Sequence, residues 1–101
     1  MNIPLSSPDI TEAERKAVQD VLKTPMLSMG PQIPAFEKGM AKLAGRKYAI
    51  AVNSGTSALH LIFSALGIGN KDEVIVPSFS FIASSNCILY VGAKPVFVDI
   101  E

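Results

Sequence analysis

The sequence has a single cysteine, Cys87, and no net charge, and each of these features argues against one kind of protein. One thiol cannot form an internal disulfide, and a cysteine-rich metal cluster is excluded. Nine lysine and arginine residues balance nine aspartate and glutamate residues in a chain of 101. This balance disfavours nucleic acid or an anionic membrane as a partner, because either would be held by bulk positive charge.

The sequence also lacks a long uninterrupted apolar run. Residues 48–70 and 74–93 carry no formal charge with His60 neutral, and both stretches are long enough to span a bilayer. Polar and chain-breaking residues interrupt both, which favours buried elements of a soluble α/β protein over membrane helices. The N-terminus shows no basic segment followed by an apolar run, so we expect no signal peptide and a cytoplasmic location.

Two helices are predicted in residues 1–47, which we take as a helical N-terminal segment. Thr11 and Glu14 have the spacing of a capping box, and apolar residues then recur at helical intervals until Pro25 stops the helix. A second amphipathic helix follows, and Gly45 is well placed to end it.

Residues 48–101 are predicted to be the start of an α/β domain. Strands and helices alternate there as strand 48–52, helix 57–66, strand 73–76, helix 81–91 and strand 96–100. Three strands alternating with helices through short loops indicate a parallel sheet. The last strand ends where another connection should begin, so we expect these residues to be part of a longer chain.

The first candidate site is the hydroxyl-rich turn at residues 53–57, between a predicted strand and a helix. Backbone N–H groups of a first helical turn are unpaired and attract anions. Gly55 lets the backbone approach an anion, and Ser54, Thr56 and Ser57 can add hydroxyl donors. Simple helix capping is the alternative. The dinucleotide and nucleoside-triphosphate motifs G-x-G-x-x-G and G-x-x-x-x-G-K-[ST] are absent.

A second candidate site follows the strand that ends at Pro77, since ligands of α/β sheets gather at the carboxyl ends of strands. Phe79 or Phe81 could lie over a planar cofactor there. Core packing is the alternative for each ring taken alone. His60 and Cys87 have no evident catalytic partner in the sequence and are expected to be structural.

Three segments, taken in order, resemble one known family. They are residues 53–59 (NSGTSAL), 67–81 (GIGNKDEVIVPSFSF) and 92–99 (GAKPVFVD). Together they resemble the N-terminal part of the DegT/StrS-type nucleotide-sugar aminotransferases, which are pyridoxal-phosphate (PLP) enzymes of fold type I. Ile3-Pro4-Leu5, and Met29-Gly30-Pro31 leading to Phe36-Glu37, also match, so the resemblance covers essentially the whole chain.

The resemblance implies specific roles for six residues. Gly55 and Thr56, with Ser54 beside them, would contact the PLP phosphate, and Phe81 would stack on the cofactor ring. Ser28 and Gly30 would lie near the sugar substrate. The lysine that binds the cofactor covalently, and the acid that pairs with its ring nitrogen, would lie later in the chain, so no catalytic residue is expected among these 101.

The family reaction moves an amino group, usually from glutamate, to a keto-sugar attached to a nucleotide, with PLP as electron sink. The resemblance implies a homodimeric complete enzyme and an isolated chain without activity. Two alternatives stay open. The chain could belong to a PLP-dependent sugar dehydratase of the same fold, or it could be a stand-alone module that binds a small anion at residues 54–57.

Overall fold

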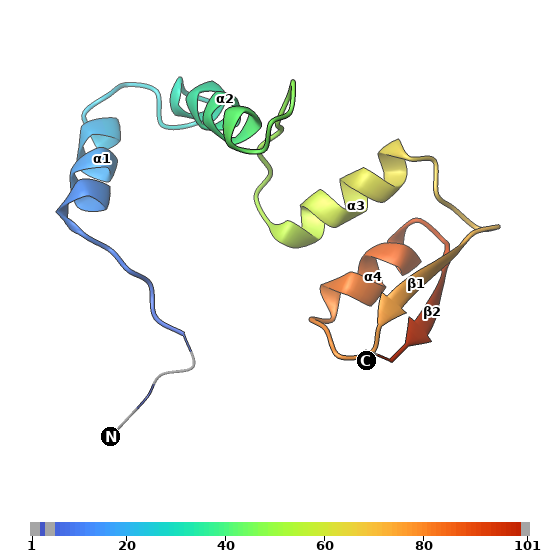
Figure 1. Cartoon of the computed structure of the whole chain (residues 1–101). Helices are drawn as coiled ribbons and strands as arrows, with labels where there is room; N and C mark the ends of the chain where they lie inside the picture. Colours follow the sequence, from blue (N-terminus) through green and yellow to red (C-terminus); the bar gives the residue numbers. More distant parts are fainter. Residues whose placement is uncertain (1–2, 4–5, 100–101) are drawn as a thin grey trace. The chain divides into compact units, whose positions relative to one another are not determined.

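The computed structural model describes residue 3 and residues 6–99 of the chain. These residues divide into two compact units, Met1–Ala51 and Val52–Glu101, and each is considered separately. Two helices belong to the first unit, and two helices and two strands to the second (Figure 1). Within the described residues, no helix is both long enough and apolar enough to cross a bilayer.

In the first unit, α1 (Glu12–Leu22) begins at the predicted capping box. The Thr11 N–H donates to Glu14 Oε2 at 2.7 Å, and the Thr11 hydroxyl accepts from the Ala13 N–H at 3.2 Å. These bonds satisfy backbone N–H groups at the start of the helix, which have no partner within it. The helix ends at Leu22, shortly before Pro25.

The second helix of this unit, α2 (Gln32–Leu43), ends as the sequence predicts. Gly45 has a positive φ of 62°, and the next N–H, that of Arg46, donates to the Ala41 carbonyl at 2.8 Å. Glycine is favoured at this left-handed position after a helix, because it has no Cβ to clash with the backbone.

The second unit contains a parallel β-α-β arrangement with a helix before it. Its elements are α3 (Gly55–Ala65), β1 (Glu73–Pro77), α4 (Ala83–Tyr90) and β2 (Lys94–Val98). The two strands pair in parallel, with Glu73 opposite Lys94 and Val76 opposite Phe97. The first pair also forms a salt bridge of 2.7 Å between Lys94 Nζ and Glu73 Oε1.

The core of the second unit lies between α4 and the sheet, and α3 packs on α4 (Figure 1). Val76, Cys87, Ile88 and Ala93 are buried there, and partly buried residues of α3 such as Phe63 pack against them. The free thiol of Cys87 is fully buried, as expected for a structural cysteine.

The α/β fold class is confirmed, but the predicted strand at residues 48–52 is wrong for the described chain. Those residues belong to no hydrogen-bonded strand, and the described sheet has two strands, β1 and β2. The physical reason is that a strand requires a neighbour to pair its backbone groups. One of these groups, the Ala51 N–H, donates instead to Glu37 Oε1 at 2.8 Å.

Several element boundaries also differ from the predictions. Helix α3 begins at Gly55 rather than Ser57, because Ser54 is its N-cap. Strand β2 begins at Lys94 rather than Val96, because the Lys94 N–H already bonds the Asp72 carbonyl at 3.0 Å. The predicted last residue of that strand, at position 100, lies outside the described residues.

Candidate functional site

The start of α3 is organised by a chain of side-chain hydrogen bonds. Ser54 Oγ accepts from the Ser57 N–H at 3.1 Å and lies 2.9 Å from Ser57 Oγ. Ser57 Oγ in turn donates to Asn53 Oδ1 at 2.7 Å. Since Ser57 has one hydroxyl proton, Ser54 must donate to Ser57, and the proton of Ser54 is used within the cap. The predicted cofactor-binding role of Ser54 therefore stays a prediction, beside a capping role that the geometry shows.

Gly55 and Thr56 are different, because their polar groups are left free at the same helix end. The first helical hydrogen bond runs from the Ala58 N–H to the Ser54 carbonyl at 3.1 Å. Among residues 3 and 6–99, neither the N–H groups of Gly55 and Thr56 nor the Thr56 hydroxyl has a hydrogen-bond partner. No acidic residue lies in this first turn, so its partial positive charge is not neutralised locally.

A cavity of about 460 Å³ adjoins this helix start. Its lining residues are Gly55, Thr56, Ala58, Leu59, Phe81, Ala83 and Ser84. The cavity thus brings together three of the predicted cofactor residues, Gly55 and Thr56 from the beginning of α3 and Phe81 from the segment between β1 and α4. Its volume falls within the range of about 300–1,000 Å³ that is typical of small-molecule sites.

The aromatic residues after β1 do not pack in the core of this unit. Phe79 is 85% exposed and Phe81 is 75% exposed. Within the described residues, neither ring packs in a core, and both aromatic faces are left open. Phe81 lines the cavity and Phe79 does not, in keeping with the choice of Phe81 that the family resemblance implies.

Ser84 is a cavity residue that sequence reasoning missed. It lies in the first turn of α4, where its hydroxyl pairs with that of Ser80 at 2.7 Å. A polar side chain shortly after a strand end was the available signal, because ligands of α/β sheets gather at this edge. Ala58, Leu59 and Ala83 add apolar wall and carry no comparable signal.

The two predicted substrate residues, Ser28 and Gly30, lie in the first unit, and their role stays a prediction. Gly30 also has a local structural reason. A Cβ at this position would lie only 2.7 Å from the Met26 carbonyl oxygen, so no larger residue fits without movement of the backbone.

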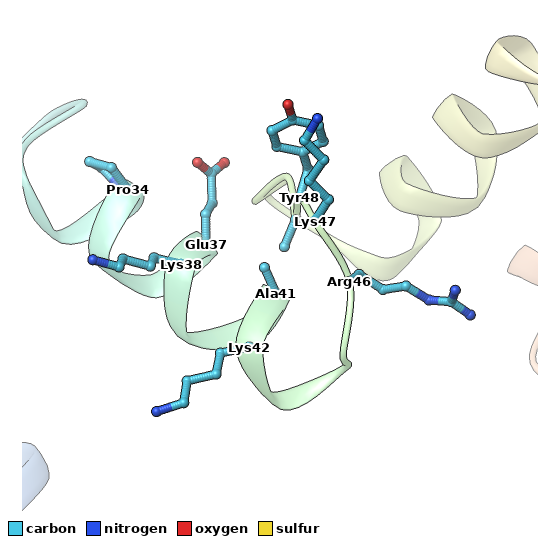
Figure 2. A pocket seen from close by; sticks show the side chains of 9 residues that line it. Pro34, Glu37, Lys38, Ala41, Lys42, Arg46, Lys47 and Tyr48 are labelled. Carbon is cyan, nitrogen blue, oxygen red and sulfur yellow. The ribbon is translucent and has the colours of Figure 1, made fainter.

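A second hollow, in the first unit, is lined by several basic side chains whose charged ends do not point to one place. It has a volume of about 410 Å³ and lies beside α2. Figure 2 shows the side chains of Lys38, Lys42 and Arg46 extending in different directions. Lys47 Nζ lies 5.0 Å from the centre of the Tyr48 ring. Because the cations diverge, this hollow offers no single position for an anion.

His60 contacts the ring of Tyr90, with the ring centres 5.6 Å apart in an edge-on arrangement. This contact joins α3 to α4 within the second unit. The structural role that the sequence favours for His60 agrees with this contact, and His60 is not among the residues that line the cavity.

The fold and the cavity together define an α/β protein with a candidate site for an anionic ligand. The cavity lies beside the segment that follows the carboxyl end of β1, at the first turn of α3, and it offers free N–H groups, a free hydroxyl and an exposed ring. This is the position at which α/β proteins bind anionic ligands.

Comparisons with known proteins identify the family. Residues 8–101 match the DegT/DnrJ/EryC1/StrS aminotransferase family, and the chain belongs to it. The chain is 48% identical over 98 residues to GDP-perosamine synthase of Caulobacter vibrioides, covering 96% of this chain and 26% of that protein.

Two solved structures show the same fold. The PLP-form of Spr1654 from Streptococcus pneumoniae has a TM-score of 0.92 and 42% identity, over 100% of this chain and 26% of that one. GDP-4-keto-6-deoxy-D-mannose-3-dehydratase of E. coli, with bound hydrated PLP, has a TM-score of 0.88 and 37% identity, over 99% and 27%. The chain therefore spans about a quarter of the length of these relatives.

Proposed function

We propose that this chain is the N-terminal quarter of a PLP-dependent aminotransferase that transfers an amino group from glutamate to a nucleotide-linked keto-sugar. The observation that carries the proposal is the cavity at which Gly55, Thr56 and Phe81 meet. Membership of the aminotransferase family and the similarity to GDP-perosamine synthase support the reaction type and the substrate class.

The start of α3 fits the phosphate group of PLP. Two unpaired N–H groups and the Thr56 hydroxyl lie at the positive end of the helix, where a phosphate is well stabilised. A Cβ added at Gly55 would meet nothing within 4 Å beyond its chain neighbours and the backbone of its own helix, and the φ of Gly55 is not positive. Neither sterics within the chain nor backbone conformation requires glycine here, so we attribute it to close approach by the ligand.

Phe81 fits the pyridine ring of the cofactor. Its side chain is 75% exposed and borders the cavity, so an aromatic face is available to a planar ligand. Stacking of two rings contributes about 0.5–1.5 kcal/mol beyond the burial of area. Gly55 and Thr56 would thus hold one end of the cofactor and Phe81 one face of its ring.

When bound, PLP supplies the electron sink for amino transfer. The residues of this chain bind and orient it: the Gly55 and Thr56 N–H groups and the Thr56 hydroxyl donate to phosphate oxygens, and Phe81 excludes water from the ring. By the family resemblance, Ser28 and Gly30 are proposed to lie near the sugar. The residue that moves protons is proposed to lie outside this sequence.

The test is amino transfer by the full-length protein. The enzyme is incubated with glutamate together with either a GDP-linked or a UDP-linked 4-keto-sugar. The products are analysed by mass spectrometry. We expect an amino-sugar nucleotide that carries ¹⁵N when the glutamate is ¹⁵N-labelled. Absence of ¹⁵N from every product, with PLP bound, would contradict amino transfer and leave the cofactor site standing.

A dehydratase of the same fold is the second candidate, and the similarity to the E. coli dehydratase favours it specifically. The same assay separates the two reactions. A dehydratase yields a sugar that has lost water and carries no ¹⁵N.

A stand-alone anion-binding module is the third alternative. It requires that the isolated chain bind phosphate unaided. The homodimeric state and the cytoplasmic location stay predictions.

A further inference from the structure

Two cavities of the second unit share a wall that is built from Phe81 and Ser84. The first is the Gly55–Thr56 cavity of about 460 Å³. The second has a volume of about 250 Å³ and is lined by Val76, Pro77, Ser78, Ser80, Phe81, Ile82, Ser84, Ser85 and Phe97. Phe81 and Ser84 thus border both cavities.

The structure holds the backbone of Phe81 in place through Ser84. The Ser84 N–H donates to the Phe81 carbonyl at 2.9 Å. The Ser84 hydroxyl pairs with the hydroxyl of Ser80, the residue before Phe81, at 2.7 Å. Ser84 is therefore bonded to two consecutive residues, to Phe81 through its backbone and to Ser80 through its hydroxyl.

Little else fixes the ring. The side chain of Phe81 is 75% exposed, so packing within this chain constrains it weakly. The N-cap residue of α4, Ile82, makes no side-chain capping bond, so the start of this helix has no side-chain cap of its own. The helix itself is anchored further along, where Cys87 and Ile88 are buried in the core. Loss of the Ser84 hydroxyl should therefore loosen the turn around Phe81 and leave α4 in place.

We propose that Ser84 is a positioning residue for Phe81, and that the Ser80–Ser84 hydroxyl pair holds the ring against the planar cofactor at the Gly55–Thr56 cavity. The inference rests on the proposed function, because it assigns Phe81 to a cofactor ring. It goes further in assigning a role to two serines, on either side of Phe81, that were not among the predicted site residues.

A double-mutant cycle in the full-length protein tests this role. PLP affinity is measured by absorbance titration of the apo protein for wild type, Ser84→Ala, Phe81→Ala and the double variant. A positioning residue acts through its partner, so the two substitutions should not be additive. Ser84→Ala should weaken PLP binding about three- to tenfold in the wild-type background, as expected for one lost hydrogen bond. In the Phe81→Ala background the same change should alter binding by less than about twofold.

Three further variants serve as controls. Ser84→Thr retains the hydroxyl and should restore PLP affinity and the induced circular dichroism of the bound cofactor, which Ser84→Ala should reduce. Ser80→Ala removes the other hydroxyl of the pair and should match Ser84→Ala. Ser85→Ala is the matched control on α4, because its hydroxyl bonds the Ile82 carbonyl at 3.1 Å and it does not line the Gly55–Thr56 cavity. Its PLP affinity should equal that of wild type.

The outcomes separate this inference from the function beneath it. Equal losses from Ser84→Ala in both backgrounds, or no loss in the wild-type background, would overturn the positioning role and leave PLP binding intact. If Ser84→Ala lowers the apo melting temperature markedly, Ser80→Ala is carried through the same cycle and decides by the same criterion. Absence of PLP binding by the wild-type protein would overturn the proposed function and this inference together.

Discussion

Thr56 and Phe81 line the same cavity, although Thr56 lies in the first turn of α3 and Phe81 follows β1. One side chain presents a hydroxyl that has no partner among the described residues, and the other an exposed ring. A ligand that joins an anionic group to a flat ring would use both, and each can be removed separately.

Thr56→Val should lower PLP affinity and leave the fold unchanged. Valine keeps the shape of the side chain but removes one donor to a charged phosphate. A hydrogen bond to a charged group is worth about 1.5–3 kcal/mol, so affinity should fall about ten- to hundredfold. Absorbance titration of the apo full-length protein measures the change, and Thr56→Ser, which keeps the hydroxyl, serves as control. Equal affinity of Thr56→Val and wild type would show that this hydroxyl does not contact the phosphate.

Gly55→Val should weaken PLP binding more than Thr56→Val does. A Cβ at Gly55 enters space that the chain leaves open, so the apo protein should melt near the wild-type temperature. The same side chain would crowd a phosphate at the helix start. Gly39→Val is the matched control, because Gly39 also has open space around its Cβ position but lies in α2. A parallel loss of PLP affinity in Gly39→Val would point to a general effect of the substitution.

The capping box of α1 should depend on pH. The hydroxyl and the backbone N–H of Thr11 donate to the Glu14 carboxylate and hold the pKa of Glu14 below its ordinary value. Since the folded pKa is lowered, this contribution is present above the unfolded pKa and is lost as pH falls through the folded pKa. NMR titration of the Glu14 carboxyl should show this lowered pKa, and Thr11→Val should raise it. Thr24→Val, which alters a hydroxyl at the other end of α1, should leave it unchanged.

The isolated chain should aggregate or remain molten. Ile75 of β1 is 71% exposed and Phe97 of β2 is 59% exposed, so the short sheet leaves large apolar side chains uncovered. Residues 48–52 are also left without strand partners in the described chain. Calorimetry and an NMR spectrum of the purified chain measure this directly. A sharp cooperative melt with well-dispersed signals would contradict the prediction.

Local signals in the sequence predicted much of this fold. The capping box at Thr11 and Glu14, the glycine stop at Gly45 and the parallel β-α-β order all depend on neighbouring residues, and all are present in the structure. The strand predicted at residues 48–52 is wrong for the described residues, because a local pattern was not enough to decide it. Its apolar pattern is local, but its hydrogen bonds require a partner strand that the described residues do not provide.

The candidate site was predictable only in part. Gly55 and Thr56 follow from helix-start chemistry, whereas the choice of Phe81 over Phe79 rested on the family resemblance. Exposure does not separate the two rings, and only the cavity does. Ser84 was not predicted, because the role proposed for it depends on a hydrogen bond to Ser80 that only the folded segment shows.

The measurement that tests the central claim most directly is PLP titration of the apo full-length protein, comparing Phe81→Ala with Phe79→Ala. Both substitutions remove an exposed phenylalanine ring from the segment between β1 and α4, but Phe81 alone of the two lines the cavity. Phe81→Ala should weaken binding about five- to hundredfold, for a loss of about 1–3 kcal/mol in burial and stacking. Phe79→Ala should bind PLP as wild type does. Equal affinities of Phe81→Ala and wild type would contradict the assignment of this cavity to the cofactor.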